Sequence, residues 1–179
     1  MVPFRLAGRF ERGDMFRRIL VAIGDDEQAA VTLSFVTALA RQHDAEVLVL
    51  HVNELVAGGR GMALRPDGEA TAIVVDAMRL LRDEGIVADG SVRRARYQKV
   101  PHRIASLAEE SSADVIVLGS SRKRRFSRLT SRQVRERTTR LTTLPIVVAP
   151  APLQLPARGH AGVEAVVHLA ANRDDSLRA

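Results

Sequence analysis

A short run of residues able to bind phosphate follows an apolar segment in the second half of the chain. Gly119, Ser120, Ser121 and Arg122 come directly after the apolar residues 114–118. Phosphate oxygens accept hydrogen bonds from groups of the kinds present here, which are accessible backbone amides, two hydroxyl groups and a guanidinium. Ligands of open parallel sheets bind beyond the carboxyl ends of the strands, so this position favours an anion site.

The same stretch is the most basic part of the chain. Residues 119–143 contain nine Arg and Lys residues and one acidic residue, Glu136, whereas all 179 residues together have a formal net charge of +6. Such a cluster can bind nucleic acid by releasing counterions. However, Phe126 is the only aromatic residue among the cations of residues 119–143, so there is no set of aromatic side chains on which bases could stack. The pattern favours a solvated basic face or a ligand phosphate, and nucleic acid is not an expected partner.

The sequence lacks the residues needed for disulfides, metal binding and hydrolysis. The chain has no Cys, which excludes disulfides and thiolate sites and fits a cytoplasmic protein. Its five His residues lack metal-ligand spacing, and there is neither a Gly-x-Ser-x-Gly motif nor a carboxylate pair suited to hydrolysis. Asp25 and Asp26 fit a helix N-cap better than a magnesium site. No apolar stretch approaches the roughly 18 residues of a membrane span. We expect a protein that is not an enzyme and does not insert into membranes.

The elements that must position these residues alternate along the chain. Apolar, β-branched runs predict strands, of which the third is polar enough for a sheet edge, and apolar residues at helical spacing follow them. The strand-like runs are residues 18–23, 46–52, 86–97, 114–118 and 145–149. The helical spacings cover residues 29–43, 70–84, 100–112 and 135–141. Residues 58–68 are rich in Gly and predict an irregular connection.

This alternation predicts an α/β fold with a parallel sheet wound by right-handed crossovers. We expect a three-layer α/β/α sandwich with a five-stranded parallel sheet, formed by a single domain at residues 17–150. Residues 1–16 and 151–179 lack the pattern and are predicted to be an extension and a tail, both candidates for disorder.

Four blocks of sequence, in order along the chain, resemble the universal stress protein family. They are residues 18–23, 50–52, 113–120 and 144–148. Several ordered blocks are far more specific than a single glycine motif. The resemblance implies a regulatory, UspA-like protein of the stress response, with a fold similar to that of the adenine nucleotide alpha hydrolases. It also implies a homodimer through the last strand, from Pro145 to Ala149.

ATP-binding members of that family have an aspartate at the end of the first strand and a loop of pattern Gly-x-x-Gly-x9-Gly-Ser/Thr. With Gly119 as the first glycine, the second falls on Arg122, the third on Arg132 and the hydroxyl residue on Gln133. The aspartate position falls on Gly24, with Asp25 beside it. Arginine side chains occupy the space through which glycines let amides approach a phosphate.

Two hypotheses follow from this modified loop. In the first, the arginines hold ATP or another adenine nucleotide, with Mg²⁺, in a changed geometry. In the second, the pocket is filled and the protein is a nucleotide-independent dimeric interaction module, with protein partners. A slow adenine-nucleotide hydrolase is a third and weaker hypothesis. The predicted ligand-binding residues are Ile23, Gly24, Asp25, Val52, Gly119, Ser120, Arg122, Arg132, Gln133 and Val134.

Overall fold

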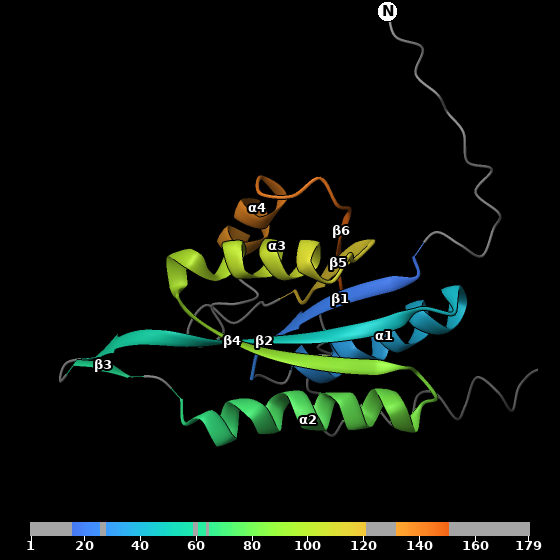
Figure 1. Ribbon diagram of the computed structural model, residues 1–179, viewed down its shortest axis with the longest axis horizontal. Helices are drawn as coiled ribbons and strands as arrows, with labels where there is room; N and C mark the ends of the chain where they lie inside the picture. Colours follow the sequence, from blue (N-terminus) through green and yellow to red (C-terminus); the bar gives the residue numbers. More distant parts are fainter. Residues whose placement is uncertain (1–15, 26–27, 59–60, 64, 121–131, 151–179) are drawn as a thin grey trace, which may run out of the picture.

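The apolar runs of the sequence form the strands of one central sheet, with helices on both of its faces (Figure 1). The computed structural model describes residues 16–25, 28–58, 61–63, 65–120 and 132–150. Its strands are β1 (Arg18–Ile23), β2 (Glu46–Gly58), β3 (Gly61–Ala63), β4 (Ala88–Arg96), β5 (Val115–Leu118) and β6 (Ile146–Val148). Its α-helices are α1 (Gln28–His43), α2 (Asp67–Asp83), α3 (Val100–Glu110) and α4 (Arg132–Thr139), and a short 3-10 turn, η1 (Tyr97–Lys99), precedes α3.

Five of the strands are parallel and lie in the order β4, β2, β1, β5, β6. The central strand β1 pairs with β2 in the register Ile23↔His51 and with β5 in the register Ala22↔Leu118. From β1 the chain winds first toward β4 and later returns to the other side as β5 and β6. The predicted parallel sheet is therefore confirmed, and its winding changes direction between β1 and β5, where ligands of open sheets bind.

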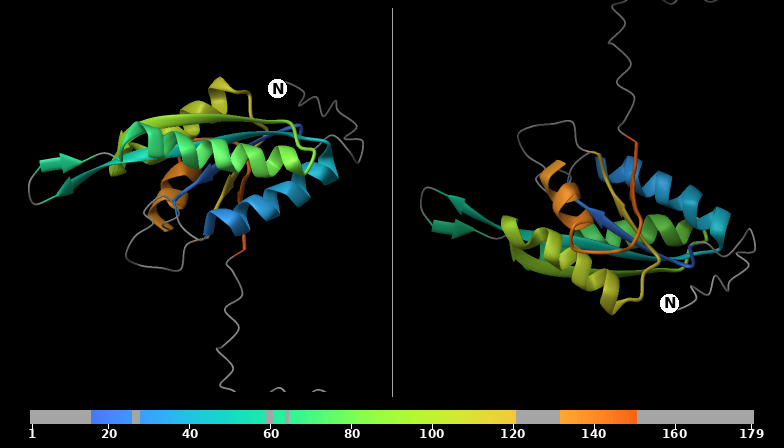
Figure 2. Two further views of the ribbon diagram at one scale, coloured as in Figure 1. Left: turned by 90° about the horizontal axis from the view of Figure 1, so that it is seen from below. Right: turned by 90° about the horizontal axis from the view of Figure 1, so that it is seen from above.

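The sheet divides the apolar core into two halves. Ile19, Val21 and Ile23 pack with buried residues of α1 and α2, whereas Leu20 and Ala22 pack with those of α3 and α4. Figure 2 shows the first helix pair on one face of the sheet and the second pair on the other. This three-layer arrangement explains why β1 is apolar at consecutive positions, since each of its faces is covered.

The predicted irregular connection at residues 58–68 is partly wrong. β2 continues to Gly58, six residues beyond its predicted end, and β3 pairs with it in an antiparallel arrangement from Val56↔Ala63 to Gly58↔Gly61. The described part of the chain thus contains a sixth strand, and the β2–β3 hairpin projects beyond the parallel sheet (Figures 1 and 2). A two-stranded hairpin needs only local pairing, so its glycine-rich sequence lacks the apolar alternation that marks a core strand.

The helices form where helical spacing predicts them, with shifted ends. α2 begins at Asp67, three residues before the predicted start, and α4 spans Arg132–Thr139 instead of residues 135–141. Gly85 has a φ of +80° and ends α2, as a glycine in the left-handed region commonly does. None of the described helices is long and apolar enough to cross a bilayer. The predictions for residues 1–15 and 151–179 lie outside the described residues.

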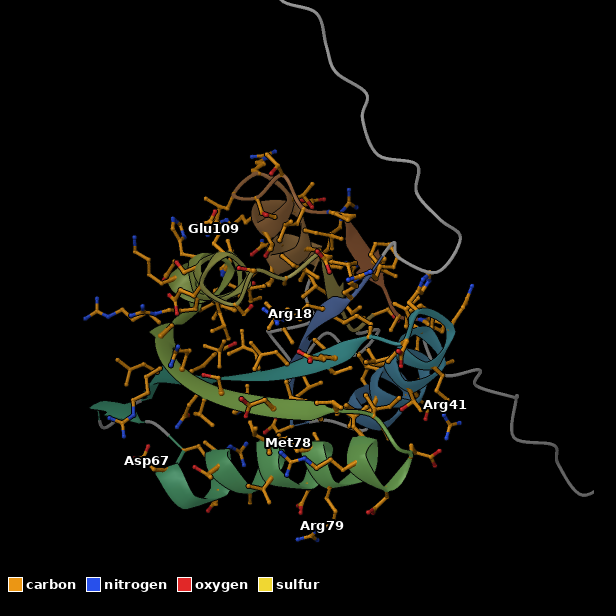
Figure 3. All side chains as sticks on the ribbon, turned by 45° about the vertical axis from the view of Figure 1, so that its right-hand side comes forward. Arg18, Arg41, Asp67, Met78, Arg79 and Glu109 are labelled. Atoms are coloured by element: carbon orange, nitrogen blue, oxygen red, sulfur yellow. The ribbon has the colours of Figure 1, made fainter. Side chains whose placement is uncertain are left out.

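Helix α2 lies very close to β4 at Gly90. A Cβ atom added to Gly90 would overlap Cγ1 of Val74 and would lie 2.5 Å from Sδ of Met78. Figure 3 shows Met78 on the side of α2 that faces the sheet, and Arg79 on the opposite side. Glycine at this position therefore lets the helix approach the strand.

Candidate functional site

The predicted site residues that follow β1 and β5 leave the sheet at the same edge. Because Ala22 pairs with Leu118 in a parallel register, Gly24 and Gly119 come just beyond neighbouring strand ends. Both glycines are buried, and Asp25 next to Gly24 is exposed. The structure thus brings together two glycines and a carboxylate at the point where the winding of the sheet changes direction.

Ser120 adds a hydroxyl group to this edge. Its Oγ atom is shielded from solvent and has no hydrogen-bond partner among the residues that the structure describes. The guanidinium of Arg135, on α4, donates a hydrogen bond of 3.5 Å through Nη1 to the carbonyl oxygen of the neighbouring Gly119. A buried hydroxyl without a partner is costly, so a ligand oxygen that accepts its proton would stabilise this position.

The three predicted residues of α4 have different surroundings. Val134 is buried in the core beneath α4. Gln133 is exposed, and its Oε1 atom accepts a hydrogen bond of 3.1 Å from the hydroxyl of Tyr97. Arg132 is exposed and donates through Nε to Glu136 over 2.6 Å, and this hydrogen bond lowers the pKa of Glu136 and raises that of Arg132.

Two further predicted residues lie in the core, and one lies outside the described residues. The side chains of Ile23 and Val52 are buried on opposite faces of the sheet. Only their backbone groups, at the end of β1 and at the neighbouring level of β2, are therefore available to a ligand. Arg122, on which the modified-loop hypothesis depends most, belongs to the part of the chain that the structure does not describe.

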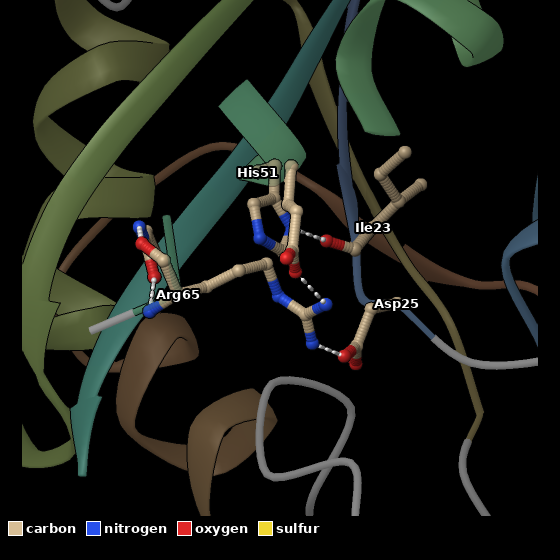
Figure 4. Close-up of polar contacts among 6 residues, drawn as sticks. Ile23, Asp25, His51 and Arg65 are labelled. Atoms are coloured by element: carbon tan, nitrogen blue, oxygen red, sulfur yellow. Dashed lines mark hydrogen bonds and ion pairs between the residues drawn. The ribbon is translucent and has the colours of Figure 1, made fainter. Parts of the chain in front are cut away.

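Arg65 is a member of the site that the sequence did not reveal. Its guanidinium forms an ion pair with Asp25 through Nη2 and a second one with Glu69 through Nη1, at 3.3 Å (Figure 4). Glu69 lies in the first turn of α2, so one arginine joins the end of β1 to the start of that helix. The sequence showed no periodic pattern that includes residue 65. Arg65 reaches the sheet edge because the chain extends along β2 and returns through β3.

Buried His51 lies beside this ion pair, in the middle of β2, where it pairs with Ile23 at the end of β1. Its Nδ1 atom is 3.2 Å from the carbonyl oxygen of Ile23, a geometry in which Nδ1 carries the proton and donates. Burial is the main cause that lowers the pKa of His51, and Arg65 lowers it further, whereas the hydrogen bond to Ile23 and the charge of Asp25 oppose this change. His51 is consequently a neutral ring at pH 7, with Nδ1 committed to the backbone of β1.

The described residues contain no cluster of three or more His, Cys, Asp or Glu side chains that would hold a metal ion. The donors at this edge are hydroxyl, amide and guanidinium groups, which suit an anion better than a cation. The arrangement can therefore bind a ligand that has a negatively charged end.

A wound parallel sheet with glycines after its central strands belongs to the class of open α/β domains that take ligands at the carboxyl edge. Within that class the family is shown directly, because the model of the universal stress protein family matches residues 15–150. The chain belongs to the universal stress protein family. No curated protein matches it.

Several solved structures share the fold. A universal stress protein from Burkholderia pseudomallei is 21% identical, with a TM-score of 0.60 over 78% of this chain and 99% of the other. One from Archaeoglobus fulgidus in complex with dAMP is 23% identical, with a TM-score of 0.57 over 76% and 99% of the two chains. A universal stress protein in complex with cAMP is 14% identical, with a TM-score of 0.56 over 75% and 97%. At these identities the likeness establishes the fold.

Proposed function

We propose that this chain is a cytoplasmic regulatory protein that binds ATP or another adenine nucleotide at the carboxyl edge of β1, β2 and β5. The buried Ser120 hydroxyl is the main support, because it lies beside Gly119 at the change of winding and lacks a partner among the described residues. Proteins of the same fold were solved with dAMP and with cAMP. Binding without rapid turnover is the proposed role.

The phosphate end of the ligand is assigned to the β5–α4 side of this edge. Gly119 and Ser120 come after β5, and Arg135 reaches the carbonyl of Gly119 from α4. Arg122 belongs to the same predicted site, and Mg²⁺ would arrive with the phosphates of ATP. Guanidinium and hydroxyl donors on this side would replace the amide contacts of the glycine-rich loop.

The proposal is tested by calorimetric titration with ATP and AMP, with and without Mg²⁺. Ser120→Ala is expected to weaken binding by about tenfold or more, since a hydrogen bond to a charged group is lost. Arg122→Glu is expected to abolish it. Ser34→Ala is the matched control, because the Ser34 hydroxyl donates to Ala30 on the exposed face of α1. Equal affinity of wild type, Ser120→Ala and Arg122→Glu would remove the site assignment.

The second candidate function is a dimeric interaction module that needs no nucleotide. It is favoured by β6, which lies at one end of the sheet order and leaves Val148 44% exposed. An apolar residue on such a strand suits pairing with a second copy through Pro145 to Ala149. Absence of nucleotide binding in the titration, together with a stable dimer, would support this function, whereas sustained phosphate release would support the slow hydrolase.

A further inference from the structure

The backbone of Arg65 is held in place by a buried side chain. Asn53, near the end of the parallel part of β2, donates through Nδ2 to the carbonyl oxygen of Arg65 at 2.9 Å. Its Oδ1 atom accepts a hydrogen bond of 3.2 Å from the amide of the same residue. Both polar groups of the buried Asn53 amide are bonded to the backbone of residue 65, so the backbone position of Arg65 is set independently of its side chain.

The guanidinium extends from this anchor across to the end of β1. Figure 4 shows it beside His51, with one nitrogen directed toward Asp25. Asp25 directly follows Gly24, so the ion pair lies at the β1–β2 end of the proposed nucleotide site. A ligand that reaches this end meets an Asp25 carboxylate that is already paired with Arg65.

The charges of this cluster show what Arg65 does to a ligand. Asp25 and Glu69 bring two carboxylates to one guanidinium, and His51 is neutral. The positive charge of Arg65 is therefore already compensated, and this side chain offers an incoming phosphate no unpaired charge. The ion pair is also easily opened, because Arg65 and Asp25 are 37% and 38% exposed.

We propose that Arg65 competes with the ligand for Asp25: its guanidinium closes the β1–β2 end of the site, and a ligand binds there by displacing it. The proposal rests on the nucleotide site proposed above and assigns to it a specificity-determining residue. A ligand that displaces Arg65 must offer Asp25 another hydrogen-bond donor, such as a hydroxyl or amino group. A ribose or a base amino group has this chemistry, whereas a phosphate does not.

The test compares Arg65→Met with wild type in titrations with AMP. Methionine keeps the backbone groups that Asn53 binds, but it cannot form an ion pair with Asp25. We expect AMP to bind about two- to fivefold tighter, the range for release of one half-exposed ion pair. Arg41→Met is the matched control, because it removes the exposed ion pair between Arg41 and Glu84, away from this edge, and is expected to leave the affinity unchanged.

The outcomes separate this proposal from the proposed function. Equal or weaker binding by Arg65→Met than by wild type would overturn the competition while the nucleotide site stands. Binding by Arg65→Met but not by wild type would support the competition and remove nucleotide binding as the function of the natural chain. Absence of binding in both would overturn both proposals. Should Arg65→Met not fold, as judged by circular dichroism, Arg65→Leu, which also lacks a donor for Asp25, carries the same expectations.

A second readout follows the movement of Arg65 itself. In nuclear magnetic resonance spectra of the wild type, saturation with AMP is expected to shift the side-chain Nε–H signal of Arg65 and the ring signals of His51. The Nε–H signal of Arg41 serves as the internal control and is expected to stay in place. Unchanged Arg65 and His51 signals at saturation would contradict displacement.

Discussion

Gly90→Ala tests the close approach of α2 to β4. The added Cβ would overlap Cγ1 of Val74 and lie 2.5 Å from Sδ of Met78, whereas unstrained atoms of this kind stay well beyond 3 Å apart. Met78 has a flexible side chain that can rotate away, but Val74 is buried and branched at Cβ, so α2 itself must move.

The size of the effect follows from two opposing terms. Overpacking of a well-packed core costs about 1–3 kcal/mol, and replacing Gly by Ala in the unfolded chain returns about 0.4–1 kcal/mol. At the midpoints of these ranges, we therefore expect Gly90→Ala to lower the free energy of unfolding by about 1.3 kcal/mol. Urea unfolding followed by circular dichroism measures this change as a lower midpoint at an unchanged slope.

Two comparisons isolate the steric cause. Gly68→Ala makes the same substitution near the start of α2, where an added Cβ meets nothing within 4 Å, so its stability is expected to equal or exceed that of the wild type. Val74→Ala combined with Gly90→Ala is expected to lose less than the sum of the two single changes, because it removes the overlapping atom. If Gly90→Ala unfolds at the same urea concentration as the wild type, the close approach does not exist in solution.

Three further predictions concern the sheet edge and the dimer. Since burial lowers the pKa of His51, the unfolded chain takes up this proton first, near pH 6.5, so stability is expected to fall as the pH drops below 6.5 toward the folded pKa. Urea unfolding at several pH values should show this loss, and His51→Gln should lack it. Asn53→Ala leaves the amide and carbonyl of Arg65 without their side-chain partner and is expected to cost about 1–3 kcal/mol of stability, again measured in urea; an unchanged value would mean that water replaces the amide. Val148→Glu places a charge on β6 and is expected to shift sedimentation from dimer to monomer, with Val75→Glu on α2 as the exposed control. Equal sedimentation of these two variants would argue against dimerisation through β6.

Local sequence was sufficient to predict the parallel sheet. The runs that became β1 and β5 are apolar at consecutive positions because helices cover both faces of the sheet, and this burial leaves a clear signature in composition. The glycines after these strands predicted where the chain turns out of the sheet. Gly24 and Gly119 accordingly follow neighbouring parallel strands, with Asp25 and Ser120 beside them.

The hairpin and the arginine that it positions were not predictable in the same way. The strand β3 has three residues and pairs with the end of β2 outside the parallel sheet, and it is too short to show a periodic pattern of apolar residues. Arg65 then depends on a buried amide from β2, and its ion pair with Asp25 joins residues 40 positions apart. A contact between residues so far apart in the sequence leaves no periodic pattern from which it could be predicted.

The amino-acid sequence by itself determined the layers, the ends of β1 and β5 and the residue types available there, because each follows from short-range patterns of burial and turn formation. The tertiary structure alone decided which of those residues meet. It buried the side chains of Ile23, Val52 and Val134 in the core and joined Arg65 to Asp25. The physical reason is that a side-chain contact depends on the path of the whole chain, which no local pattern contains.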